Sequence, residues 1–225
     1  MPGGNPTYIY GAPISLQERF VQDVRELKRV NPLGKISVIT TSSTLSRYLK
    51  KCLVSEGDGF LNIEFSTLEF FAFAQFLRGG EKLRWLRDAT FHTLAIRNFL
   101  KSGEEHLAPA YYETIRDLRD SALDVSILMK FVKEYTELQS GNIPSYLNKL
   151  EELTNIANDY QNFLMKHSIC DDSEMISRAM SHLNLDDISA VAVYGFYDAT
   201  QIQIDFLLAL VDHATRRDIP IMLYI

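Results

Sequence analysis

The first stretch of this sequence with the spacing for chemistry is TYIYGAPISLQERFVQDV, residues 7–24. It predicts a short strand, a glycine turn and a helix start, an arrangement in which backbone N–H groups hold a phosphate. Against the phosphate-loop pattern G-x-x-x-x-G-K-[ST], Gly11 matches the first glycine. Leu16 then replaces the second glycine, Gln17 the lysine and Glu18 the magnesium-binding hydroxyl.

These replacements remove the chemistry of a phosphate loop. Leu16 places a side chain where backbone must approach the anion. Glu18 places a negative charge beside it, and like charges about 4 Å apart repel by about 4 kcal/mol at an effective dielectric of about 20. Ser15 and Glu18 form a capping-box pattern, which predicts that the helix begins at Ser15. We therefore expect a self-capped turn derived from a phosphate loop, with no bound nucleotide.

A second stretch, VAVYGFYDATQIQIDFLLAL at 191–210, predicts an apolar strand, a glycine turn and an apolar helix. In nucleotide-hydrolysing proteins an acidic group at the end of such a strand holds Mg²⁺. Here that place is taken by Tyr194 and Gly195. Asp198 and Gln203 follow, and their simpler interpretations are a cap for a helix starting near Thr200 and a half-exposed helix residue. No catalytic residue is expected in either stretch.

Two further groups of residues carry side chains that could bind phosphate or stack on a base. The first follows the buried strand ISVIT (36–40), where hydroxyl groups could bind phosphate or cap the next helix, and both alternatives stay open. The second holds a tryptophan that could stack on a base, although a packed tryptophan is more common. These candidate residues are Thr40, Thr41, Ser42 and Ser43, and Arg84, Trp85 and Arg87.

Composition and charge restrict the kinds of binding partner that the sequence predicts. The chain is 46% hydrophobic and 23% charged, as in a soluble globular protein, and its net charge of −6 predicts only weak binding to nucleic acid. The five histidines lack metal-ligand spacing, and Asp171–Glu174 is interpreted as an acidic helix cap, so no metal is expected. Two lone cysteines, with no signal-peptide pattern and no membrane-length apolar run, predict a cytoplasmic protein without membrane contact.

Hydrophobic patterning divides the chain into three parts. Residues 1–78 alternate strand and helix, and 187–225 return to strand and helix. Between them, 79–186 are predicted as a helical insertion, with 81–184 helical throughout apart from short breaks such as the one at 141–144. This order predicts an α/β fold in which a parallel sheet is interrupted by a large all-helical insertion. The last residues, IPIMLYI, form an apolar strand, so we expect a piece of a longer polypeptide. The sheet should hold strands near 7–10, 36–40, 61–65, 190–194 and 219–224.

The two motif-like stretches and the segments between them resemble a known family. In UvrD-type superfamily 1 helicases the second ATPase motif reads D-E-F-x-D-x-x-x-x-Q, and Phe196, Asp198 and Gln203 match it. YGFYDATQIQ is similar to the GF.D.T..Q strand of AddB/RexB-type subunits of bacterial helicase–nucleases. ISVITTSSTLSRYLKKCL, YYETIRDLRDSALDVSILMKF and LEELTNIANDYQNFLMKHSICDDSEMISRAMSHL resemble other segments of that family, so the resemblance covers nearly the whole chain.

The resemblance implies a RecA-like (P-loop NTPase-like) helicase subdomain that is catalytically inactive and needs no cofactor. It would be the N-terminal part of an ATP-dependent exonuclease subunit whose PD-(D/E)XK nuclease lies downstream. Its partners would be a motor helicase subunit and single-stranded or double-strand-end DNA, in double-strand-break repair and recombination. Two alternatives remain: a functional NTPase or DNA helicase domain with a non-standard nucleotide loop, and an unrelated α/β protein-interaction module.

Overall fold

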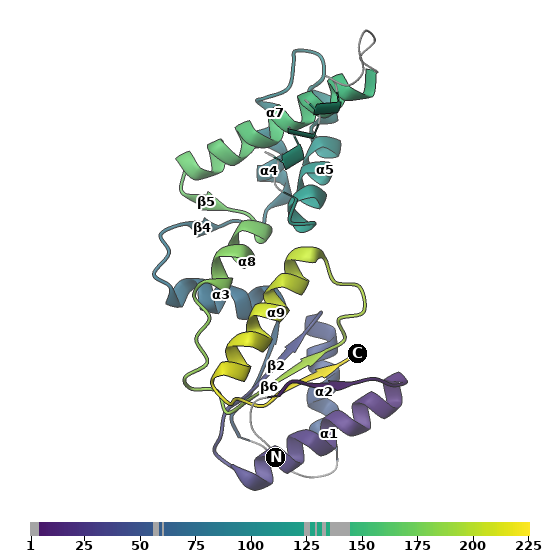
Figure 1. The fold of residues 1–225 in the computed structure, drawn as a ribbon, viewed down its shortest axis with the longest axis vertical. Coiled ribbons are helices and arrows are strands. Elements are labelled where there is room, and N and C mark those ends of the chain that lie inside the picture. Colours follow the sequence, from purple (N-terminus) through teal and green to yellow (C-terminus); the bar gives the residue numbers. More distant parts are fainter. Residues whose placement is uncertain are drawn as a thin grey trace. The chain divides into compact units, whose positions relative to one another are not determined.

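The computed structural model describes residues 5–55, 59, 61–123, 127–128, 130–131, 134–135 and 145–225, with only the backbone of 145–147. The chain divides into two compact units (Figure 1). The sheet unit comprises Met1–Glu81, Ile176–Ala199 and Gln203–Ile225. The second unit comprises Lys82–Met175 with Thr200–Ile202. The sequence predicts the boundaries between the sheet and the helical insertion at residues 79 and 187.

The sheet unit contains a five-stranded parallel sheet. Its spatial order is β1-β7-β6-β2-β3, and every neighbouring pair is parallel. The predicted α/β class with a parallel sheet is therefore confirmed, and a strand lies at each of the five predicted places. The strands are β1 (Thr7–Ile9), β2 (Ile36–Thr40), β3 (Ile63–Thr67), β6 (Ala190–Tyr194) and β7 (Ile221–Tyr224).

Helices cover both faces of this sheet, as the continuous apolar runs of its central strands require. α1 (Pro13–Val30) and α2 (Ser43–Val54) cover one face, where Phe20 and Leu49 join the core. α3 (Leu68–Arg78) and α9 (Gln201–Arg216) cover the other. There Phe71 and Phe206 meet edge to face, with ring centroids 6.3 Å apart. Figure 1 shows α9 on the near face of the sheet and the paler α2 on the far face.

The second unit has its own core, built by helices with apolar stripes. Its elements are the 3₁₀ helix η1 (Glu105–Leu107), α4 (Ala89–Arg97), α5 (Ala108–Asp120), α7 (Ser145–Lys166) and the two short strands β4 (Arg84–Trp85) and β5 (Ile169–Cys170). Buried Ile96, Ile115 and Tyr160 bring α4, α5 and α7 together. From β5 the chain enters α8 (Asp172–Met180), whose last residues belong to the sheet unit.

The prediction that residues 81–184 are helical throughout is wrong at β4 and β5. These strands pair in parallel over only two residues each, Arg84 with Ile169 and Trp85 with Cys170. A pairing so short leaves no alternating pattern in the sequence. The predicted helix break at 141–144 lies outside the described residues. Within the described part of the chain, no helix is both long and apolar enough to cross a membrane.

Candidate functional site

The turn after β1 is shorter than a phosphate loop. β1 ends at Ile9 and α1 already begins at Pro13, with Ala12 as its N-cap residue and no side-chain cap. The predicted capping box of Ser15 and Glu18 is therefore wrong. Proline suits the first helical turn because its φ is preset and it has no N–H to satisfy.

The residues aligned with the phosphate-binding positions lie inside α1. The side chain of Leu16 is 1% exposed in the core, and its backbone N–H donates to the carbonyl of Ala12 at 3.0 Å. Gln17 accepts a hydrogen bond from the Tyr48 hydroxyl of α2, and Glu18 is exposed. Because these N–H groups belong to a helix interior, Gly11 is not followed by a loop that could surround an anion.

The crevice between α1 and the carboxyl ends of β6 and β7 is filled by aromatic rings. Tyr194, at the place expected for a magnesium-binding acid, stacks on Tyr224 with ring centroids 5.5 Å apart. Phe20 of α1 meets both rings edge to face, at 5.7 and 5.5 Å. Burial raises the pKa of Tyr194 to about 12, so its hydroxyl stays neutral near pH 7. The crevice thus holds uncharged packing in place of metal ligands.

A hydrogen bond and an ion pair connect the Tyr224 ring to α1. The Tyr224 hydroxyl donates to Asp23 Oδ2 at 2.9 Å, and Arg19 Nε lies 3.0 Å from Asp23 Oδ1. Burial, with the negative charge of Asp23, raises the pKa of Tyr224 well above its usual range. Sequence reasoning missed this pair, although an acid on the apolar face of the α1 pattern was a signal. Asp23 and Tyr224 lie 201 positions apart, so only the fold could join them.

Gly195 ends β6 in a conformation that requires glycine. Its φ is +87°, and an added Cβ would lie 2.8 Å from Leu45 Cδ2. Its N–H donates to the Tyr224 carbonyl at 3.1 Å, which continues the sheet hydrogen bonding. At Gly195, where the motif would have its second acid, the backbone conformation therefore favours glycine. Asp198 is exposed, and Gln203 is half-buried within α9, which begins at Gln201.

The four residues with hydroxyl side chains that follow β2 differ in burial and in hydrogen bonding. Thr40 is buried, and its hydroxyl lies 2.7 Å from Ser46 Oγ and donates to the Ser42 carbonyl at 3.0 Å. Ser42 is the N-cap of α2, since its side chain accepts from the N–H of Leu45 at 3.2 Å. Thr41, Ser42 and Ser43 are exposed, so DNA contact at these residues stays a prediction.

Trp85 has a structural role in the second unit. Its indole Nε1 donates to Asp172 Oδ1 at 2.7 Å, which joins β4 to the first turn of α8. The Arg87 guanidinium lies over the Trp85 ring, 5.0 Å from its centroid, and Arg84 is exposed. Because Arg87 covers one ring face, a base could stack only on the other.

A polar network that sequence reasoning missed surrounds a cavity of about 40 Å³ in the second unit. Arg119 forms an ion pair with Asp171, in which Nε lies 2.8 Å from Oδ2 and Nη2 lies 3.1 Å from Oδ1. Asp171 Oδ1 also accepts from the Glu174 N–H at 2.9 Å, so the prediction of an acidic cap on this helix is confirmed. Buried His92 bonds the Tyr160 hydroxyl at 2.8 Å. The cavity has room for water but not for a substrate, so we assign the network a structural role.

Among the described residues, no group of three or more His, Cys, Asp or Glu is placed to hold a metal ion. Comparison with protein-family models and with curated proteins found no match to this chain. The functional assignment therefore depends on the geometry above together with the motif resemblance.

Proposed function

We propose that this chain is a RecA-like, helicase-related domain that has lost nucleotide chemistry and serves as a scaffold in processing DNA ends. The observation that carries the proposal is the cluster of Phe20, Tyr194 and Tyr224 between the two motif-bearing segments. It occupies the space in which a nucleotide phosphate and its metal would have to lie.

The order of the strands supports this proposal. β1, which leads into the degenerate phosphate loop, and β6, which leads into the degenerate second motif, are separated only by β7. Their carboxyl ends are thus about 10 Å apart, given about 4.8 Å between neighbouring strands. In open α/β sheets ligands bind in the crevice outside these ends. Two motifs so placed could once have held one nucleotide between them.

The role in DNA-end processing comes from the resemblance to AddB/RexB-type subunits. In that role the chain would support a motor helicase subunit and would contact single-stranded DNA, while a nuclease domain would lie elsewhere in the full protein. The chain itself would be neither ATPase nor nuclease. This division of labour requires a stable surface for partners and no turnover at the filled crevice.

The test combines two assays on the 225-residue chain. We expect no ATP hydrolysis above the buffer blank, with or without single-stranded DNA, and weak binding of a labelled oligothymidine by fluorescence anisotropy that disappears as salt is raised. DNA-stimulated hydrolysis would contradict the loss of nucleotide chemistry. Absence of oligonucleotide binding at low salt would contradict the DNA-related role.

A second candidate function is a protein-interaction module, and one feature favours it. A mostly apolar hollow of about 300 Å³ lies beside α9 and β7. Leu208, which lines it, is 57% exposed, and Tyr197 is 62% exposed. A domain that acts only through such a surface would show no oligonucleotide binding at any salt concentration.

A further inference from the structure

The cations of the sheet unit are unevenly neutralised. Those outside α1 and α2 each form an ion pair with an acid, namely Lys35, Arg78, Arg178, Arg216 and Arg217. Besides the buried Lys28, four cations on α1 and α2 form no ion pair with any acid of the described residues: Arg29, Arg47, Lys50 and Lys51. All four are exposed. An acidic chain with net charge −6 thus keeps a concentration of unneutralised positive charge on one face.

The excess of positive charge is also confined to one stretch of the sequence. Residues 13–54 contain eight Lys and Arg but three acids, and none of the acids follows Glu26. A cation interacts favourably with the C-terminal end of a helix dipole, which explains why Arg29 and Lys51 lie in the last turns of α1 and α2. It does not explain Arg47, which lies near the start of α2. The two helices pack beside each other on the same face of the sheet, so their outer surfaces are continuous.

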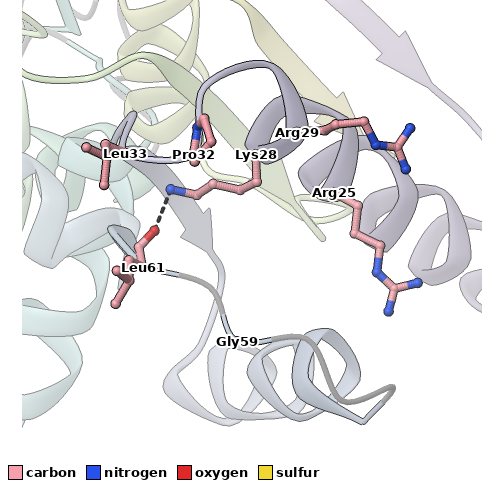
Figure 2. A pocket seen from close by; sticks show the side chains of 7 residues that line it. All are labelled: Arg25, Lys28, Arg29, Pro32, Leu33, Gly59 and Leu61. Carbon is pink, nitrogen blue, oxygen red and sulfur yellow. Dashed lines mark hydrogen bonds between the residues drawn. The ribbon is translucent and has the colours of Figure 1, made fainter.

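The surface also contains a hollow of about 440 Å³ at the C-terminal end of α1. Figure 2 shows Lys28 reaching toward Leu61, while Arg25 and Arg29 extend in another direction in this view. Lys28 Nζ donates to the carbonyls of Gly34 at 2.5 Å and of Leu61, which ties two loops together at the mouth of this hollow. Its charge is therefore held in place while Arg29 stays exposed to solvent.

An aromatic ring lies among these cations. Tyr48 of α2 is 51% exposed, and its hydroxyl donates to Gln17 of α1, which fixes the ring between the two helices. Lys50 lies over the ring of Phe65 at 5.2 Å, so its ammonium is held close to the sheet edge. A basic surface with an interleaved aromatic side chain is the arrangement by which proteins bind single-stranded nucleic acid without sequence preference.

We propose that the outer surface of α1 and α2 binds the phosphate backbone of single-stranded nucleic acid through Arg29, Arg47, Lys50 and Lys51, with Tyr48 stacking on a base. This inference rests on the proposed function and moves its DNA contact away from Trp85, which is engaged by Asp172 and Arg87. Phosphate favours these positions because a guanidinium can bind it in a bidentate manner and a lysine as a point charge.

The test measures oligothymidine affinity of the full chain at several salt concentrations. The triple variant Arg47→Ala, Lys50→Ala, Lys51→Ala should bind at least about tenfold more weakly, and its salt slope should fall by about 2, given about 0.7 per phosphate contact on single strands. The matched control Lys82→Ala, Arg84→Ala, Arg97→Ala removes three exposed cations of the second unit. It should bind within about twofold of the unchanged chain. Tyr48→Leu should weaken binding about fivefold or more without altering the salt slope, because stacking releases no counterions.

The outcomes separate this inference from the proposed function. If the unchanged chain binds the oligonucleotide and only the second-unit control weakens it, the surface is wrong but the DNA-related role stands. If the unchanged chain binds vesicles containing phosphatidylserine and no oligonucleotide, both proposals are overturned. Equal affinity of the α1–α2 variant and the unchanged chain, with circular dichroism showing both folded, would also overturn the inference.

Discussion

At the scale of single residues, the positions that align with nucleotide-binding motifs have structural tasks. Tyr194 supplies packing where an acid would hold Mg²⁺, and Leu16 supplies core contact where backbone would approach phosphate. Gly195 is required because its φ is positive and Leu45 approaches it. Restoring one motif residue would therefore damage packing before it could restore binding.

The glycine requirement predicts a measurable difference between two sites. Gly195→Ala should lower the free energy of unfolding by about 1–3 kcal/mol, mainly through backbone strain, with a smaller contribution from displacing the end of the Leu45 side chain. Gly80 has a similar φ of +71° but no atom within 4 Å of an added Cβ, so Gly80→Ala should cost only about 1–2 kcal/mol. Urea unfolding followed by circular dichroism measures both. Equal losses would show that the contact with Leu45 does not matter.

The buried tyrosines predict a fall in stability at alkaline pH. The folded state raises the pKa of Tyr194 to about 12 and that of Tyr224 as well, chiefly by burial. The unfolded chain has a tyrosine pKa of about 10, so above about pH 10 unfolding releases phenolic protons and the free energy of unfolding decreases. Below that pH these groups are neutral in both states and add no pH dependence.

Tyr224→Phe isolates one of these phenols. At neutral pH it should cost about 1–3 kcal/mol, because buried Asp23 loses a donor. Above about pH 10 its stability should fall less steeply than that of the unchanged chain. Tyr10, 72% exposed, offers the control Tyr10→Phe, which should keep the full slope. Parallel slopes for all three proteins in urea unfolding would contradict the assignment.

At the scale of elements, helix starts decide which residues are available for function. α1 begins at Pro13 because proline suits a first turn, so the residues that align with the phosphate-binding positions lie within the helix. α2 begins after the Ser42 cap, so Ser42 is engaged by the N–H of Leu45, although it is exposed like Thr41 and Ser43. The two helix boundaries thus decide which of these residues take part in the helix ends.

The cap of α2 can be tested against its neighbour. Ser42→Ala should lower the free energy of unfolding by about 0.5–2 kcal/mol, because the N–H of Leu45 loses its acceptor. Ser43→Ala changes an exposed first helical residue and should be nearly neutral. Thermal or urea unfolding compares them directly. A larger loss for Ser43→Ala would indicate that the helix begins elsewhere.

Much of the sheet could be predicted from the sequence, and most of the site could not. Strands such as ISVIT and AVAVY are continuous apolar runs, so local pattern was sufficient. β4 and β5 are too short to leave a pattern. The filling of the crevice depends on Phe20, Tyr194 and Tyr224, which come from three separate segments, and no local rule predicts their meeting.

At the scale of the whole molecule, β1 and β6 flank β7 in a parallel sheet, and aromatic rings fill the space beside the ends of β6 and β7. Within the described part of the sheet unit, the exposed cations without an ion pair lie on the outer surface of α1 and α2. Under the proposed function, such a domain would support DNA-handling machinery while a partner carries out ATP hydrolysis.

The most direct test of this account is isothermal titration calorimetry of the 225-residue chain with ATP and Mg²⁺. We expect no saturable heat up to millimolar nucleotide. In the described part of the chain Leu16, Gln17 and Tyr194 stand where the glycine, the lysine and the acid of a nucleotide site would hold phosphate and its metal. The buried acid nearby, Asp23, is engaged by Tyr224 and Arg19. Saturable binding with a micromolar Kd that is lost on mutation within residues 11–18 would contradict the central claim.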